Sequence, residues 1–339
     1  AVAAALRSAV TGREDVVAFL IYDVLLERVD FSEDGSMALV WYVLSDKETG
    51  ETIPSELSLA LGMKSGDTWR IVVQADPDWA EMLGQVPEVL LSQEQKERYM
   101  PDIQQVPKDH QVFTGYRLPW PGGTARRVSG SIGHVLTYKT CPSTCLYAYD
   151  FADGTMFPIV AAKGGRVKYA VWNWPNGNTE HTNYIVLEDT STSPATYQVY
   201  YHLAQDSIPV DLRTIGAPVY QGQFIGNADD TGASSGHHLH FHVHTNPNTH
   251  WGTSVDIVFE DVTDNGGRPR TCLETAQFPD YGRQCSSGNW YVSNNYGDDE
   301  VPTGDLTTPA AGQVVTEPVM NVSGWASDNK GVASIQVLA

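Results

Sequence analysis

The chain has no long hydrophobic run and few basic residues. No stretch of its 339 residues approaches the roughly 20 consecutive apolar residues that a membrane-spanning helix needs, so no transmembrane segment is expected. Lys and Arg total 21 against 41 Asp and Glu, and the net charge of −20 argues against nucleic acid as a partner. Apolar residues make up 41% of the chain, which suffices for ordinary cores, and the length suggests two or three domains.

Cysteine is also scarce, with four residues in the whole chain. They form two close pairs, Cys141 with Cys145 and Cys272 with Cys285. An even number of cysteines in local pairs predicts two disulfides and an oxidising compartment. In an alternative interpretation Cys141 and Cys145 bind zinc, although no second pair lies nearby in the sequence to complete such a site.

Histidine alternates with apolar residues over 237–244, in the sequence HHLHFHVH. On a β-strand, alternate side chains point to the same face. We therefore expect one face to carry imidazoles and the other to pack into a core. The imidazole face comprises His238, His240, His242 and His244, and the core face Leu239, Phe241 and Val243. A row of imidazoles on a rigid strand predicts a metal or proton-transfer site. A histidine tag or a solvated polar face is the alternative, but a tag would not interleave apolar residues at strand spacing.

A metal site needs ligands from other segments, and four residues are candidates. Asp150 lies between aromatic residues in a strand-like run, where a carboxylate is costly to bury without a cation or hydrogen-bond donors. His202 also lies in a strand-like run, in the sequence YYHL. His134 and His181 are the other isolated histidines that we consider as partners.

Three blocks of the sequence carry a family resemblance. They are 133–167 with YAYDF at its centre, 200–226 beginning with YYHL, and 231–241 ending in HLHF. Their order and spacing resemble the lysostaphin/LytM-type zinc metallopeptidases, which cleave peptide cross-bridges or stem peptides of bacterial peptidoglycan. The resemblance covers about a third of the chain.

The resemblance implies a role for each matching residue. His134, Asp150 and His240 fall on the family's three ligands of a single Zn²⁺ ion. His202 and His238 fall on its two active-site histidines that do not bind the metal. A zinc ion held in this way would lower the pKa of bound water toward about 7 and polarise the scissile carbonyl.

The sequence departs from the family pattern in three places. Met156-Phe157 is inserted into the family's Gly-Thr-Pro-Val run, and the family's short spacing between the ligand His and Asp is absent, since position 146 is Leu. His134 lies sixteen residues before Asp150, and the Cys141–Cys145 pair falls in the intervening segment. His181 is therefore an alternative ligand. His242 stands where the family has an acid after HLHF.

The expected fold is mainly β, with an antiparallel β-sheet LytM-like catalytic domain and a small α+β N-terminal domain. In the N-terminal domain we expect strands over 16–29 and 37–44 joined at Asp34-Gly35, a strand over 69–73, and a helix over 80–99. The expected divisions are an N-terminal module 1–100, a linker 101–123, a zinc peptidase domain 124–262, a disulfide-tied extension and linker 263–305, and a partial bacterial immunoglobulin-like segment 306–339.

These expectations together describe a secreted or cell-envelope bacterial zinc endopeptidase that hydrolyses peptide bonds in peptidoglycan or glycine-rich peptides. The alternative is a non-catalytic LytM-like protein that binds the wall or a partner protein and regulates another enzyme. A zinc protein with the same fold but no peptidase activity is a third possibility. The oligomeric state and the role of residues 1–100 stay open: a propeptide, a substrate-binding domain and a packing cap all fit.

Overall fold

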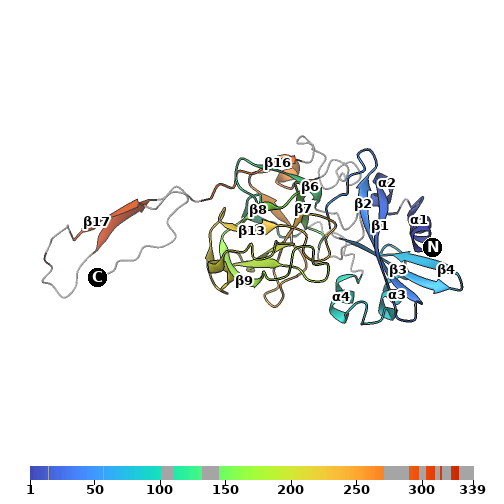
Figure 1. The fold of residues 1–339 in the computed structure, drawn as a ribbon. Coiled ribbons are helices and arrows are strands. Elements are labelled where there is room, and N and C mark those ends of the chain that lie inside the picture. Colours follow the sequence, from blue (N-terminus) through green and yellow to red (C-terminus); the bar gives the residue numbers. More distant parts are fainter. Residues whose placement is uncertain are drawn as a thin grey trace.

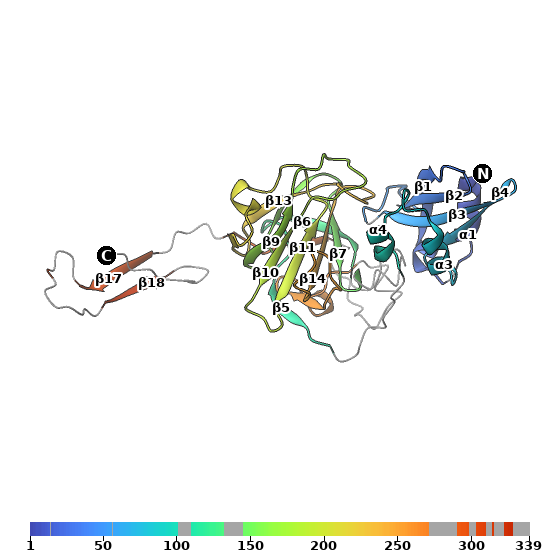
Figure 2. The same ribbon diagram turned by 90° about the horizontal axis from the view of Figure 1, so that it is seen from below.

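The structure is a computed structural model, and it describes residues 1–13, 15–55, 57–100, 110–131, 145–270, 290–297, 303–309, 314 and 322–327. Most of its regular structure is strand in antiparallel sheets, which confirms the expected mainly β class. Figures 1 and 2 show an N-terminal module beside a larger β domain, with a two-stranded hairpin set apart on the far side. None of the helices in the described ranges has the length and hydropathy of a membrane span.

The N-terminal module is built on a four-stranded antiparallel sheet in the order β1-β2-β3-β4. Its elements are α1 (Val2–Val10), α2 (Val17–Ile21), β1 (Tyr22–Phe31), β2 (Met37–Asp46), β3 (Ser58–Ser65), β4 (Thr68–Val73), α3 (Trp79–Gln85) and α4 (Gln93–Arg98). Both faces of β2 are buried, because alternate side chains enter different cores. Val40 and Tyr42 pack in the cluster that contains Leu6 of α1, whereas Leu39 and Trp41 pack in the cluster that contains α3.

Three details of this module differ from expectation. The expected strand over 16–29 begins only at Tyr22, because Val17–Ile21 is helical. The strand β3 was not expected at all. The expected helix over 80–99 is two short helices, since Pro87 follows α3 and cannot continue it. The second helix, α4, begins at Gln93, and the side chain of Ser92 caps it in a capping box with Gln95.

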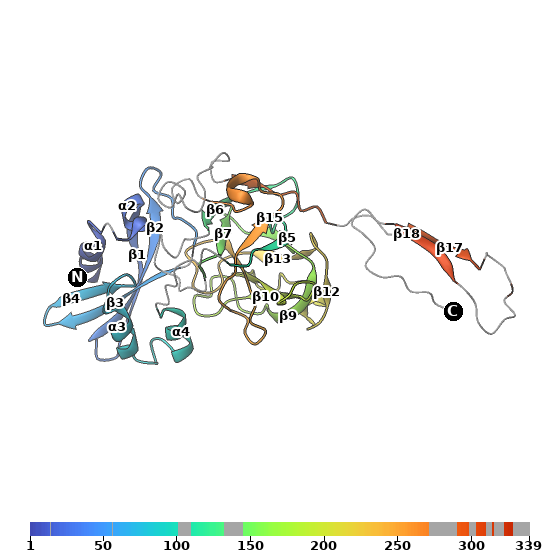
Figure 3. The ribbon, with the colours of Figure 1, turned by 180° about the vertical axis from the view of Figure 1, so that it is seen from behind.

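The larger domain contains an eight-stranded antiparallel sheet in the order β12-β9-β10-β11-β14-β7-β6-β16. In chain order these strands are β6 (Ala125–Gly130), β7 (Tyr149–Ala152), β9 (Gly165–Val171), β10 (Tyr184–Asp189), β11 (Thr196–Tyr201), β12 (Pro218–Val219), β14 (His238–His244) and β16 (Trp290–Val292). Smaller pairs join β13 (Phe224–Ala228) to β8 (Phe157–Val160) and, in parallel, β15 (Ile257–Phe259) to β5 (Phe113–Tyr116); Figure 3 shows the second pair. Two 3₁₀ turns, η2 (Val210–Arg213) and η3 (Asp264–Gly266), complete the described elements of this domain. One hydrophobic core gathers side chains from most of these strands.

The C-terminal part of the chain is described only in pieces. Strands β17 (Thr303–Thr308) and β18 (Ser323–Ser327) pair antiparallel, and the expected immunoglobulin-like segment is not confirmed by this hairpin. Cys145 is disulfide-bonded. Its expected partner Cys141, like Cys272 and Cys285, lies outside the described residues, so both expected pairings stay predictions.

Candidate metal centre and catalytic histidines

The strand β14 places four imidazoles in the middle of the eight-stranded sheet. It lies between β11 and β7 (Figure 2). All seven of its residues are buried. The expected alternation is present, because Leu239, Phe241 and Val243 belong to the main hydrophobic core. The imidazoles share the other face. This face is not a solvated polar surface, because all four histidines have 0% exposure.

Asp150 and His240 meet across the β7–β14 pair, where they are register partners. The Nδ1 of His240 lies 3.1 Å from Oδ1 of Asp150, and both residues are fully buried. An imidazole nitrogen and a carboxylate oxygen attract at this distance only when a proton or a cation lies with them. Two ligands of one tetrahedral zinc ion lie about 3.3 Å apart, so these donor atoms fit zinc. The third expected ligand, His134, lies outside the described residues.

The carboxylate of Asp150 also depends on a neighbouring glycine. Gly130, at the end of β6, pairs with Asp150, and a Cβ built at Gly130 would lie 2.7 Å from Oδ2 of Asp150. Glycine therefore leaves room for this carboxylate beside β6.

The contact between His240 and His242 suits a metal-bound His240. Nε2 of His240 lies 3.0 Å from Nδ1 of His242. If Nδ1 of His240 binds a metal, it cannot carry a proton, so Nε2–H donates to His242. With a metal at His240, His242 would thus accept a hydrogen bond at the position where the family has an acid.

The two histidines expected not to bind metal lie beside this pair. His202 follows β11 with a φ of 63°, a left-handed conformation that is uncommon for a residue other than glycine. Its Nδ1 lies 2.7 Å from the carbonyl oxygen of Thr231, so Nδ1–H donates there and Nε2 is the unprotonated nitrogen of the neutral ring. His238 donates from Nδ1 to the carbonyl oxygen of Gly236 at 2.9 Å, and its Nε2 lies 4.0 Å from Oδ1 of Asp150. The centroids of the His202 and His238 rings are 4.6 Å apart.

Trp251 contacts this row of imidazoles, and sequence reasoning missed it. Its ring centroid lies 4.8 Å from those of His240, His242 and Tyr201. The indole therefore covers two imidazoles with an apolar surface. No local pattern marks Trp251, because the contact depends on how the loop after β14 returns to the sheet.

The proposed substitute ligand His181 occupies a different place. It is exposed and stacks on Trp174 with a centroid separation of 4.0 Å. Its described ring contact is thus with an aromatic side chain rather than with Asp150 or His240.

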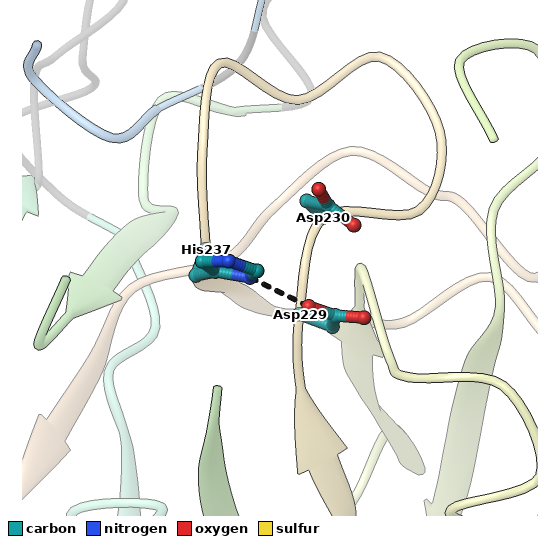
Figure 4. Close-up of side chains that lie close together, drawn as sticks. All are labelled: Asp229, Asp230 and His237. Atoms are coloured by element: carbon teal, nitrogen blue, oxygen red, sulfur yellow. Dashed lines mark ion pairs between the residues drawn. The ribbon is translucent and has the colours of Figure 1, made fainter. Parts of the chain in front are cut away.

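A second polar group lies just before β14 and was also missed. Asp229, Asp230 and His237 offer ligand atoms within 4.8 Å of one another (Figure 4). However, Nδ1 of His237 lies 2.5 Å from Oδ1 of Asp229, closer than the roughly 3.3 Å between two ligands of one tetrahedral zinc ion. We therefore interpret these two residues as an ion pair that fixes the start of β14. Burial and the neighbouring Asp230 raise the pKa of Asp229, whereas His237 opposes this shift.

At the far end of β14, His244 is held neutral. Burial, together with the nearby His250, lowers the pKa of His244 to about 4. Its ring stacks on Tyr197 at a centroid separation of 5.2 Å, and its Nδ1 accepts a hydrogen bond from the backbone N–H of Asn246 at 3.2 Å. An accepting nitrogen is available only in the neutral ring, which agrees with the direction of the shift.

Residues 146–251 match the model of peptidase family M23. This segment contains Asp150, His202, His238 and His240, whereas His134 precedes it. No curated protein matched the chain.

Several solved structures align with parts of the chain. A structure of the SpoIIQ-SpoIIIAH pore forming complex is 26% identical over 29% of this chain and 56% of its own, with a TM-score of 0.23. A zinc containing peptidase from Vibrio cholerae is 20% identical over 61% of this chain and 52% of its own, with a TM-score of 0.28. The catalytic domain of lysostaphin from Staphylococcus simulans is 24% identical over 42% of this chain and 86% of its own, with a TM-score of 0.25. The chain thus spans little more than half the length of the first two.

Proposed function

We propose that the larger domain is a zinc-dependent endopeptidase that hydrolyses peptide bonds in peptidoglycan or in glycine-rich peptides. The observation that carries this proposal is the buried contact of 3.1 Å between His240 and Asp150. The contact lies within the segment that matches a peptidase family. Sequence resemblance and side-chain geometry therefore indicate the same pair of residues.

The residues that would hold the zinc ion are Asp150, His240 and His134. When bound, the ion supplies a hydroxide at neutral pH and polarises the scissile carbonyl. The ligand set is expected to leave one position open, because a catalytic zinc has three protein ligands and a site for water.

His202 and His238 would handle protons and charge around the scissile bond. Each donates its Nδ1–H to a backbone carbonyl oxygen, so each neutral ring has Nε2 as its basic nitrogen. A base of this kind can take a proton from the attacking water and return it to the leaving amine. A protonated imidazole can donate to the developing oxyanion, and removing one such donor costs about 2.7–4 kcal/mol of barrier.

We also place the protein outside the cytoplasm, in the secreted or cell-envelope compartment of a bacterium. The disulfide at Cys145 supports this placement, because disulfides persist mainly in oxidising compartments.

The test compares the wild-type chain with His240→Ala, Asp150→Asn and His134→Ala, each purified after loading with zinc. Zinc content and release of peptides from purified wall fragments and from a pentaglycine peptide are measured together. All three variants are expected to lose both zinc and activity. His181→Ala is the matched control and is expected to keep both.

Three results would contradict this proposal or a part of it. Full activity in His240→Ala would remove the zinc role, and retention of zinc in His134→Ala with its loss in His181→Ala would transfer the third ligand to His181. Wild-type protein that holds zinc and binds wall fragments without cutting any peptide would favour the non-catalytic alternative.

A further inference from the structure

A cavity of about 600 Å³ lies between the N-terminal module and the larger domain. The module contributes Trp41, Leu91 and Glu88 to its walls, and the larger domain contributes Tyr201 and His202. Because His202 is a proposed catalytic histidine, the cavity opens beside the reaction site. Figure 2 shows α4 on the side of the module that faces the larger domain.

Hydrogen bonds between backbone and side chains hold the two walls together. The segment around Ser55 meets the loop before β14 through Ser235, whose hydroxyl donates to the carbonyl oxygen of Ser55 at 2.8 Å and accepts from its N–H at 2.9 Å. The N–H of Leu57 donates to the carbonyl oxygen of Ala233 at 3.1 Å. This loop leads directly into the strand of catalytic histidines, so the module is positioned against the site itself.

The charges that line the cavity do not balance. Arg28 pairs with Asp30 at 3.0 Å and also donates to Thr179 on the opposite wall. Glu88 and Glu180 then face the cavity from opposite walls; both are exposed, and neither has an ion-pair partner among the described residues. With neutral histidines the lining carries a net charge of −2, because Arg28 offsets one of three carboxylates.

We propose that the N-terminal module forms the second wall of the substrate cleft and selects peptides that carry a positively charged amino group near the scissile bond. This inference rests on the proposed function, because it takes His202 as part of the reaction site. Glu88 and Glu180 attract the ammonium group from both sides. Trp251, which also lines the cavity and is half-buried, offers aromatic surface to the aliphatic part of such a side chain, whereas the ring of Trp41 already lies under the guanidinium of Arg28.

The experiment uses the full zinc-loaded chain and two synthetic glycine-rich peptides that are identical except at one side chain. One peptide carries lysine, and the other carries Nε-acetyl-lysine, which has no charge. For each protein, kcat/KM is measured with both peptides, and the value for the lysine peptide is divided by the value for the acetyl-lysine peptide. The binding constants of the two peptides for the metal-free chain are compared in the same way. Tryptophan fluorescence reports binding, because two tryptophans line the cavity.

The wild-type chain is expected to prefer the lysine peptide by about two- to thirtyfold, since two exposed charge pairs contribute about 0.2–1 kcal/mol each. Glu88→Gln and Glu180→Gln should each lower this ratio, and the double variant should bring it close to 1. Glu33→Gln, in the exposed turn between β1 and β2, is the matched control and should keep the wild-type ratio.

Equal use of both peptides by the wild-type chain would overturn the inference, as would an unchanged ratio in the double variant. A rise in the rate on both peptides in Glu88→Gln would also overturn it, because the module would then act as an inhibitor. Cleavage of both peptides without preference removes this inference and leaves the proposed function standing. Charge-dependent binding without any cleavage would leave the cavity as a binding site for the charged peptide and would remove the proposed peptidase function.

Discussion

Gly130 matters because of the carboxylate that lies beside it. A methyl group at this position would lie 2.7 Å from Oδ2 of Asp150, closer than two non-bonded atoms can approach. Because Asp150 is a proposed zinc ligand, we expect Gly130→Ala to displace it and to lower zinc affinity and peptidase activity together, by at least tenfold, since misplacing a metal ligand is costly. Zinc competition with a chromogenic chelator measures the affinity.

Gly84→Ala is a suitable control for this substitution. Gly84 lies in α3, is exposed, and has no atom within 4 Å of its added methyl group. Alanine favours helix there by about 1 kcal/mol, so this variant should keep its zinc affinity and be no less stable. Equal zinc affinity in both glycine variants would show that Asp150 tolerates the crowding.

His242 would accept the hydrogen bond from Nε2–H of a His240 whose Nδ1 binds zinc. It is fully buried, and its Nδ1 lies 3.0 Å from Nε2 of His240. His242→Leu removes the acceptor while keeping an apolar side chain against Trp251, and we expect zinc affinity to fall by about 10- to 100-fold. His242→Gln restores an acceptor oxygen and should recover part of the loss. The same chelator competition measures both, and equal affinity in wild type and His242→Leu would show that the hydrogen bond does not orient the ligand.

The element that the sequence predicts best is β14. Its alternation is a local property, so the strand and its two faces are read directly from HLHFHVH. The strands that pair with β14 cannot be predicted from its local sequence. Its partners β7 and β11 lie about 90 and 40 positions away along the chain. Asp150 was assigned through the family resemblance, and only the register of β7 against β14 brings it to His240.

Tertiary contacts account for most of the remaining errors, and a missed local signal accounts for one of them. Residues 17–21 are apolar enough for a strand or a helix, and the contacts of α2 within its module decide between them. The division of 80–99 into two helices was readable from Pro87 and from the Ser92-x-x-Gln95 capping box, and the longer apolar spacing obscured both. Trp251, Asp229 and His237 gain their roles only from tertiary contacts.

The far end of β14 links stability to pH through His244. Its pKa in the folded chain is about 4, against about 6.5 in the unfolded chain, so the unfolded chain binds more protons between these values. The stability from the neutral ring is therefore complete above pH 6.5 and is lost as the pH falls toward 4. A shift of this size corresponds to about 3 kcal/mol.

His244→Phe removes this titration while keeping a ring that stacks on Tyr197. We expect the free energy of unfolding in urea to fall between pH 6.5 and pH 4 for both proteins. For the wild type the fall should be about 3 kcal/mol larger than for the variant. Circular dichroism across this range measures both curves. Parallel curves for the two proteins would show that His244 titrates normally in the folded chain.

At the scale of the whole molecule, the net charge of −20 would govern how the chain approaches the wall substrate proposed above. Cell-wall polymers carry much negative charge, so long-range repulsion opposes encounter. Salt screens this repulsion, since the Debye length falls from about 30 Å at 0.01 M to about 8 Å at 0.15 M. We expect the rate on anionic wall fragments to rise several-fold over this range.

Two other substrates separate this effect from a general effect of salt on the enzyme. An uncharged glycine peptide should be cut at the same rate throughout, because it feels no net field. A lysine peptide should be cut more slowly as salt rises, because screening weakens its attraction to Glu88 and Glu180 in the cavity. Initial rates at each salt concentration show whether cleavage speeds up for the wall fragments, stays constant for the uncharged peptide and slows for the lysine peptide. If all three rates move together, salt acts on the folded chain and the global charge does not govern encounter.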